Sequence, residues 1–199
     1  MPPKKLVNKD KNEFGVVEFP SPKEWHQWLS KNHATLEGVW LKFHKKNSGL
    51  KSINYAEAVE EALCFGWIDG HVKPFDANSW IQKFTPRRAK SIWSKRNTER
   101  VTRLIEQGRM KPAGLKEIEA AKSDGRWQKA YDSPVNMTAP DDFLKVLTKN
   151  KKAKQFFDSL NKTNKYAINW RLQTAKKPET REKRMKVILE MLAKGEKFH

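Results

Sequence analysis

The sequence predicts an α+β protein, in which a small sheet with a hairpin is covered by helices and is followed by an all-α helical module. Apolar residues alternate with period two in the first half of the chain, at residues 38–44 and 67–84. Helical periods surround these stretches and fill the chain beyond residue 140. Between the two parts, residues 131–139 contain proline and polar residues without any period, which is typical of a linker.

These patterns divide the chain into four parts. Residues 1–18 are polar and basic and are expected to form a disordered arm. Residues 19–130 are expected to form the α+β domain, residues 131–139 the linker, and residues 140–195 the helical module.

The first helix is expected over residues 21–32. Ser21 and Glu24 have the spacing of a capping box, and a proline stands at the first helical position. Trp25 and Leu29 follow four residues apart, so one apolar face is available for burial.

The sheet is expected from the residues that come next. One strand with a buried face is predicted over residues 38–44. A helix over residues 55–65 follows, with Asn54 and Glu57 as its capping box. Residues 67–84 then read as two strands joined by a turn. One layer of sheet covered by helices on one side accounts for this order.

A basic helix is expected over residues 94–107. Its buried face is predicted to consist of Val101, Leu104 and Ile105. The opposite stripe carries arginines at i, i+4 and i+7, namely Arg96, Arg100 and Arg103. The segment GLKEIEAAKSDG predicts one more helix before the linker.

Four short helices are expected after the linker, and no strand. Their predicted starts lie near Pro140, Asn150, Thr163 and Pro178. Each carries a few large apolar residues on one side, so together they predict a compact basic bundle.

The overall charge points to an anionic partner. The formal net charge is +18, and it is spread over both halves of the chain. Such a balance favours nucleic acid or another polyanion. The lone Cys64 fits a reducing, cytoplasmic location. No apolar run approaches the ~20 residues that a membrane span requires, so no membrane insertion is expected, and no pattern specifies an oligomeric state.

The segment from Leu63 to Asn97 carries the strongest candidate site. It holds three of the eight tryptophans beside a dense group of cations. Guanidinium groups bind phosphate or carboxylate in a bidentate manner, and indole rings stack on flat groups. The predicted anion-binding residues are Arg87, Arg88, Lys95, Arg96, Arg100 and Arg103, and the predicted stacking or pocket residues are Trp67, Trp80, Trp93 and Asn97.

Other reactive residues are expected to have structural roles. Asp69 lies in a half-buried strand and is expected to form an ion pair with one of the arginines that follow. Cys64 is expected to be a buried, inert thiol. No histidine has a partner at metal-ligand spacing, so no metal site, cofactor or catalytic residue is predicted. A second basic group stands at the start of the last helix and includes Lys176, Lys177, Arg181, Lys183 and Arg184.

Several longer motifs identify a family resemblance. They read ALCFGWIDG, FTPRRAKSIWSKRN, GRMKPAG and AKKPETREKRMKVILEML. From Trp25 to Leu192 the chain resembles the YdeI/OmpD-associated family, also called bacteriocin-protection-like. The resemblance implies the family's helical module from Pro140 to Lys194, preceded by an α/β domain that is frataxin-like in outline. The family name implies a role in stress protection and implies no reaction.

The sequence therefore predicts a non-enzymatic cytoplasmic protein that binds nucleic acid or a phosphorylated ligand. The alternative is an enzyme or small-molecule receptor whose cleft is lined by Asp69, Arg87, Arg88, Trp93 and Asn97. A third hypothesis is an interaction module without a ligand.

Overall fold

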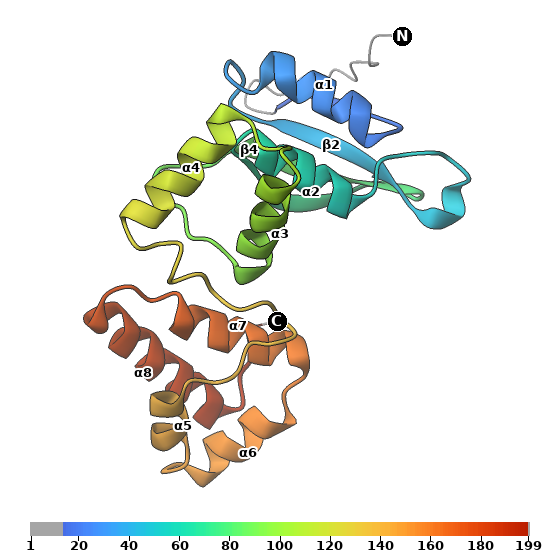
Figure 1. The fold of residues 1–199 in the computed structure, drawn as a ribbon. Coiled ribbons are helices and arrows are strands. Elements are labelled where there is room, and N and C mark those ends of the chain that lie inside the picture. The colour runs from blue at the N-terminus through green and yellow to red at the C-terminus, as the bar shows by residue number, and fades with distance from the viewer. Residues whose placement is uncertain (1–13, 199) are drawn as a thin grey trace. The chain divides into compact units, whose positions relative to one another are not determined.

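The computed structural model describes residues 14–198, and it is a mixed α+β fold (Figure 1). Contacts divide the chain into two compact units. Unit 1 contains residues up to Ile92 and from Asn97 to Gln128, and unit 2 contains residues Trp93–Arg96 and those from Lys129 onward.

The sheet of unit 1 has four strands in the order β1-β2-β4-β3. They are β1 (Val16–Glu18), β2 (Val39–His44), β3 (Trp67–Asp76) and β4 (Ser79–Pro86). The first two strands are parallel and the others pair antiparallel, so the predicted hairpin is present as β3 and β4.

Strand β1 corrects the prediction of an unstructured arm over residues 1–18. Residues 1–13 lie outside the described part of the chain, but Val16–Glu18 pair with Trp40–Lys42 of β2. Val16 and Val17 are both buried. Two adjacent β-branched residues that pair with a long strand and bury their side chains outweigh the basic composition around them.

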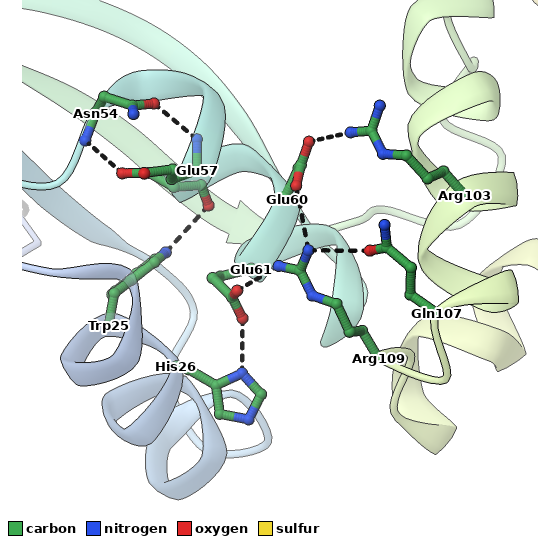
Figure 2. A network of polar contacts seen from close by, with 10 residues as sticks. Trp25, His26, Asn54, Glu57, Glu60, Glu61, Arg103, Gln107 and Arg109 are labelled. Atoms are coloured by element: carbon green, nitrogen blue, oxygen red, sulfur yellow. Dashed lines mark hydrogen bonds and ion pairs between the residues drawn. The ribbon is translucent and has the colours of Figure 1, made fainter.

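Four helices complete unit 1: α1 (Pro22–Asn32), α2 (Tyr55–Cys64), α3 (Lys95–Glu106) and α4 (Pro112–Ser123). A short 3-10 turn, η1 (Lys46–Ser48), follows β2. The first two residues of α3 group with unit 2. The capping box of Asn54 and Glu57 is confirmed at the start of α2 (Figure 2). The predicted box at Ser21 is wrong, because the Ser21 side chain makes no capping hydrogen bond; the proline at the first turn is present.

The core of unit 1 lies between the sheet and α1 and α2. Val39, Leu41 and Phe43 of β2 point into it and are almost completely buried. Trp25 of α1 connects the layers, because its ring lies edge-on to Phe84 of β4 and its indole N–H donates to the Ala58 carbonyl of α2 at 3.1 Å.

Unit 2 is built from the helices α5 (Asp141–Leu147), α6 (Lys151–Ser159), α7 (Lys162–Gln173) and α8 (Pro178–Lys194), and no strand occurs within 140–194. The start of α6 is confirmed, because the Asn150 side chain accepts from the Ala153 N–H. The start of α7 was misplaced, since Asn161 caps that helix. The buried core of the bundle consists of Phe143, Leu147, Ala153, Phe157, Leu160, Ile168, Leu172, Ile188 and Leu192.

Candidate functional site

The turn that carries Arg87 and Arg88 presents only one of its two guanidinium groups to solvent. Arg87 is 7% exposed, and its Nη2 donates to the carbonyl oxygen of Ile92 at 2.9 Å. This hydrogen bond holds the turn from inside. Arg88 is exposed.

The arginine stripe predicted on α3 does not form one open surface. Arg100 is buried and donates to the Asn97 side chain at 3.0 Å, and Arg103 forms an ion pair with Glu60. Ile105, predicted to be buried, is exposed, whereas Val101 and Leu104 are buried as predicted. The helix is therefore rotated from the predicted orientation, with Arg100 on its covered side.

The remaining two cations of the predicted site lie at the start of α3. The Lys95 ammonium is 2.6 Å from a carboxylate oxygen of Asp132 in unit 2. That ion pair and a hydrogen bond from Gln173 hold the pKa of Asp132 below its usual value, against the opposing effect of burial. Arg96 is exposed.

Two of the tryptophans predicted to stack on a ligand are core residues. Trp67 is buried, and its indole N–H donates to the His33 carbonyl at 3.1 Å. Trp93 is also buried. Trp80 is partly exposed and stacks on Phe43 with ring centroids 5.3 Å apart.

Asp69 has a different partner from the predicted arginine. Its carboxylate accepts a hydrogen bond of 2.6 Å from the Tyr55 hydroxyl, and the side chain is partly exposed. Asp69 sits opposite Phe84 in the hairpin, and Tyr55 opens α2. A phenol at the start of a neighbouring helix reaches this position, so the charge needs no buried cation.

A polar network that the sequence interpretation missed lies on α2 (Figure 2). Glu61 accepts from His26 Nδ1 of α1 at 2.6 Å and from Arg109 at 2.5 Å. Glu60 binds Arg103 of α3 and, at 3.4 Å, Arg109. Glu61 is buried, although a glutamate on a helix usually faces solvent. The helical spacing of residues along α2 does not predict this network, because the partners of the two glutamates lie in distant segments of the chain.

Electrostatics within this network favour the charged form of Arg109. Burial alone would lower the pKa of Arg109, but hydrogen bonding and the charge of Glu61 outweigh it, so the pKa lies above its usual value. One turn further along α2, Cys64 is buried. Burial, with the nearby charge of Glu61, raises the pKa of the Cys64 thiol to about 12.

The outer face of the sheet, opposite the helix-packed core, carries aromatic rings and lysines. Val16 lies opposite Trp40, and Trp40 lies opposite Lys83 on β4. Val16, Trp40 and Ile81 form a small apolar cluster, to which Phe14 adds its ring. No helix contributes a hydrophobic member to this cluster among residues 14–198.

Three lysines of this face place their ammonium groups over aromatic rings. Lys73 lies 4.8 Å from the centroid of the Trp40 ring, and Lys83 lies 4.4 Å from that of Phe14. Lys42 lies 4.7 Å from the centroid of Phe75, and it also contacts the carboxylates of Glu18 and Asp76. We call Phe14, Trp40, Phe75, Lys73 and Lys83 the outer-face cluster.

A hollow of about 1040 Å³ opens beside the outer-face cluster. It begins at residues 14–17 and extends past Gly38 to Trp28 of α1. Volumes of this order hold small ligands or a short length of a polymer. Its wall includes Phe14, Trp28, Trp40, Lys73, Phe75 and Ile81.

Among residues 14–198, no three His, Cys, Asp or Glu side chains gather so that they could hold a metal ion. Within the same part of the chain, no helix is both long and apolar enough to cross a membrane. The expected absence of a metal and of a cofactor stays a prediction.

An α+β unit with an aromatic and basic sheet face, joined to a small helical bundle, is the class of protein that this structure defines. Residues 17–117 match the family model described as "Domain of unknown function (DUF8412)", and residues 136–195 match that described as "Bacteriocin-protection, YdeI or OmpD-Associated". The chain thus belongs to the DUF8412 family, whose model covers just over half of it, and it carries a YdeI/OmpD-associated domain in its helical module. No curated protein and no solved structure matches the chain.

Proposed function

We propose that the protein binds single-stranded nucleic acid through the outer-face cluster of its sheet. The observation that carries this proposal is the placement of Lys73 and Lys83 over the rings of Trp40 and Phe14, beside the hollow. Aromatic rings with adjacent fixed cations are the two components that single-strand recognition combines.

Each component has a separate role in the proposal. Phe75 is 39% exposed, so a base can stack on it without any rearrangement. Trp40 is 6% exposed and becomes accessible when the Lys73 side chain turns from the ring toward a phosphate. Lys42 is held by Glu18 and Asp76 and is assigned a structural role.

The net charge of +18 supports a polyanion as the partner. Lys83 has no ion pair among the described residues and provides an available charge. Arg88 and Arg96 of the originally predicted site are exposed and remain candidates for additional phosphate contacts.

A binding role is better supported than a cleft enzyme. The enzyme hypothesis needs Asp69 and Arg87 to act together on a substrate. The Asp69 carboxylate is engaged by Tyr55, and Arg87 is engaged by the Ile92 carbonyl. Both hydrogen bonds indicate structural roles for Asp69 and Arg87 in unit 1.

The test measures binding of a fluorescent oligothymidylate of about 15 nucleotides at several salt concentrations. Each phosphate contact to a single strand changes the slope of log affinity against log salt by about −0.7. Lys73→Ala with Lys83→Ala should therefore flatten the slope by about 1.4. Phe75→Ala should weaken binding by about 1–3 kcal/mol without changing the slope, because stacking releases no counterions.

A matched control removes the same charge from the helices of unit 1. Lys31 at the end of α1 and Lys116 on α4 are exposed and make no described ion pair. Lys31→Ala with Lys116→Ala should leave the slope unchanged within about 0.3. Equal flattening by both pairs would show attraction by net charge alone and would refute the assignment of the outer face.

A further inference from the structure

A second hollow, of about 540 Å³, lies on the helical bundle of unit 2. It is formed by the end of α7, one side of α8 and Phe198, which follows α8. The lining from α8 recurs at the spacing of one helix face, from Glu179 through Lys183 to Val187. None of these residues belongs to the outer-face cluster, and the inference is independent of the proposed function.

The floor of this groove is apolar. Val187 is 52% exposed although it lies in the middle of a helix, and Ile188 beside it is buried in the bundle core. Phe198 adds an aromatic ring to the same groove. An exposed aliphatic side chain in a concave site is available for burial against a ligand.

The rim of the groove is basic and is held in position. The Arg171 guanidinium carbon lies 4.2 Å from the centroid of the Phe198 ring, so the planar cation stacks on the aromatic ring. Arg184 donates from Nη1 to the Arg171 carbonyl at 2.7 Å. Lys183 is exposed and lines the same groove. Ordered guanidinium groups bind carboxylates at a lower entropic cost than mobile ones.

The rim also offers hydrogen-bond acceptors. Glu179 and Thr180 of the first turns of α8 line the same groove. The Glu179 carboxylate accepts hydrogen bonds from backbone N–H groups, which a peptide has and a phosphodiester backbone lacks. Beside the Phe198 ring, which Arg171 contacts, the floor of the groove is aliphatic and consists of Val187 and Ile188. The mixture of groups therefore matches a peptide better than a nucleic acid.

We infer that this groove is a docking site for an acidic peptide segment that carries one large aliphatic side chain. The aliphatic side chain packs on Val187 and Ile188. The acidic side chains bind Arg171, Lys183 and Arg184, and the peptide backbone donates to Glu179. Among these contacts, the apolar anchor supplies affinity and the basic rim selects the charge.

The test uses fluorescein-labelled pentapeptides and the full chain. The probe has two glutamates on each side of a central leucine, and two comparison peptides replace the leucine by serine or the glutamates by lysines. The leucine peptide should bind about tenfold more tightly than the serine peptide, and the lysine peptide should not bind measurably. Equal affinity of the leucine and serine peptides would overturn the inference.

Variants locate the binding on the protein. Val187→Asp and Lys183→Glu should each weaken the leucine peptide about tenfold. Lys152→Glu on α6 makes the same change of charge at an exposed position outside the groove and should alter affinity less than about twofold. Circular dichroism checks that each variant is folded.

Two results would contradict the groove as a peptide site. Equal weakening by Lys152→Glu would show that the peptide responds to net charge. The groove would be assigned to nucleic acid if an oligothymidylate displaced the peptide and if Val187→Asp abolished oligothymidylate binding. The variant with Lys73→Ala and Lys83→Ala should lose oligothymidylate binding and keep its affinity for the peptide. The two proposals can therefore be refuted separately.

Discussion

Glu61 shows how one buried carboxylate organises unit 1. Its carboxylate contacts His26 of α1 and Arg109 of the segment before α4, so it connects α2 to two other parts of the chain (Figure 2). Glu61→Gln removes the charge from a buried site that is bonded to a cation. We expect the free energy of unfolding to fall by about 1.5–3 kcal/mol, as measured by urea denaturation.

The control for Glu61 is Glu119→Gln on α4, an exposed carboxylate without a described partner. It should change stability by less than about 0.5 kcal/mol. A Glu61 variant as stable as the control would mean that the network contributes nothing to unit 1.

Cys64 gives a second prediction for a single residue. Because burial raises its pKa to about 12, the thiol stays protonated and covered at neutral pH. In the native protein, Ellman's reagent should react with Cys64 only as fast as the chain opens, and in denaturant it should react at once. Rapid reaction of the native protein would contradict the burial of this thiol.

Single residues are where the sequence predicted least. The burial of Cys64 followed from its apolar neighbours, and the structure confirms it. The partner of Asp69 was wrong, because Tyr55 reaches it across the fold rather than along the chain. Trp67 and Trp93 were assigned to a binding surface, but large aromatics bury so much apolar area that core positions compete strongly for them.

The packing of α4 on α2 depends on Gly114. A Cβ added there would lie 2.4 Å from the Cys64 carbonyl oxygen and 2.7 Å from that of Leu63. Both are backbone atoms, so relief requires one helix to move. Gly114→Ala should lower stability by about 1–3 kcal/mol, although alanine normally stabilises a helix by ~1 kcal/mol.

Gly15 provides the comparison for Gly114. No atom lies within 4 Å of a Cβ added at Gly15, and its φ lies outside the left-handed region. When both variants are compared by thermal denaturation, Gly15→Ala should be neutral or slightly stabilising. A gain in stability for Gly114→Ala would show that α4 is not held this close to α2.

The ion pair between α5 and α8 predicts a pH dependence for unit 2. Arg181 donates to both carboxylate oxygens of Asp142, at 2.9 and 2.7 Å, and this bonding lowers the pKa of Asp142. Its contribution is therefore complete above the unfolded pKa of about 3.9 and is lost as the pH falls through the folded pKa. The stability difference from Asp142→Asn should be up to about 1 kcal/mol at pH 6 and should vanish near pH 2.

Asp141 is the adjacent control, because it has no ion pair among the described residues. In thermal melts of both variants between pH 2 and pH 6, the stability difference from Asp141→Asn should change less with pH than that from Asp142→Asn. A stability difference between the wild type and Asp142→Asn that grows toward low pH would contradict a stabilising role for this ion pair.

At the scale of elements, periodicity predicted most of the fold. The hairpin, α2 with its capping box and the helices of unit 2 lie close to their predicted positions, because their amphipathic patterns are strong. Strand β1 was missed because three residues are too few to show a period. The rotation of α3 was missed because Arg100 is stabilised on the covered side by Asn97, a partner whose contact no apolar pattern encodes.

For the whole molecule, the sequence predicted a basic binding protein but placed the site on other residues. The charge was visible in the composition, and the cations around Arg87 formed a dense group beside three tryptophans. Pairing with Glu60, Asp132 and backbone carbonyls occupies several of them. The outer-face cluster was not predicted, since it assembles residues from three strands and from Phe14.

The most direct test of the outer face is an NMR titration of the ¹⁵N-labelled chain with an oligothymidylate of about eight nucleotides. If the strand binds the outer face, the largest chemical-shift changes are expected for the Trp40 indole N–H and for the backbone amides of Lys73, Phe75 and Lys83. Amides of α8 should stay unchanged. Shifts confined to residues 87–96, with the Trp40 indole unmoved at saturation, would contradict the account.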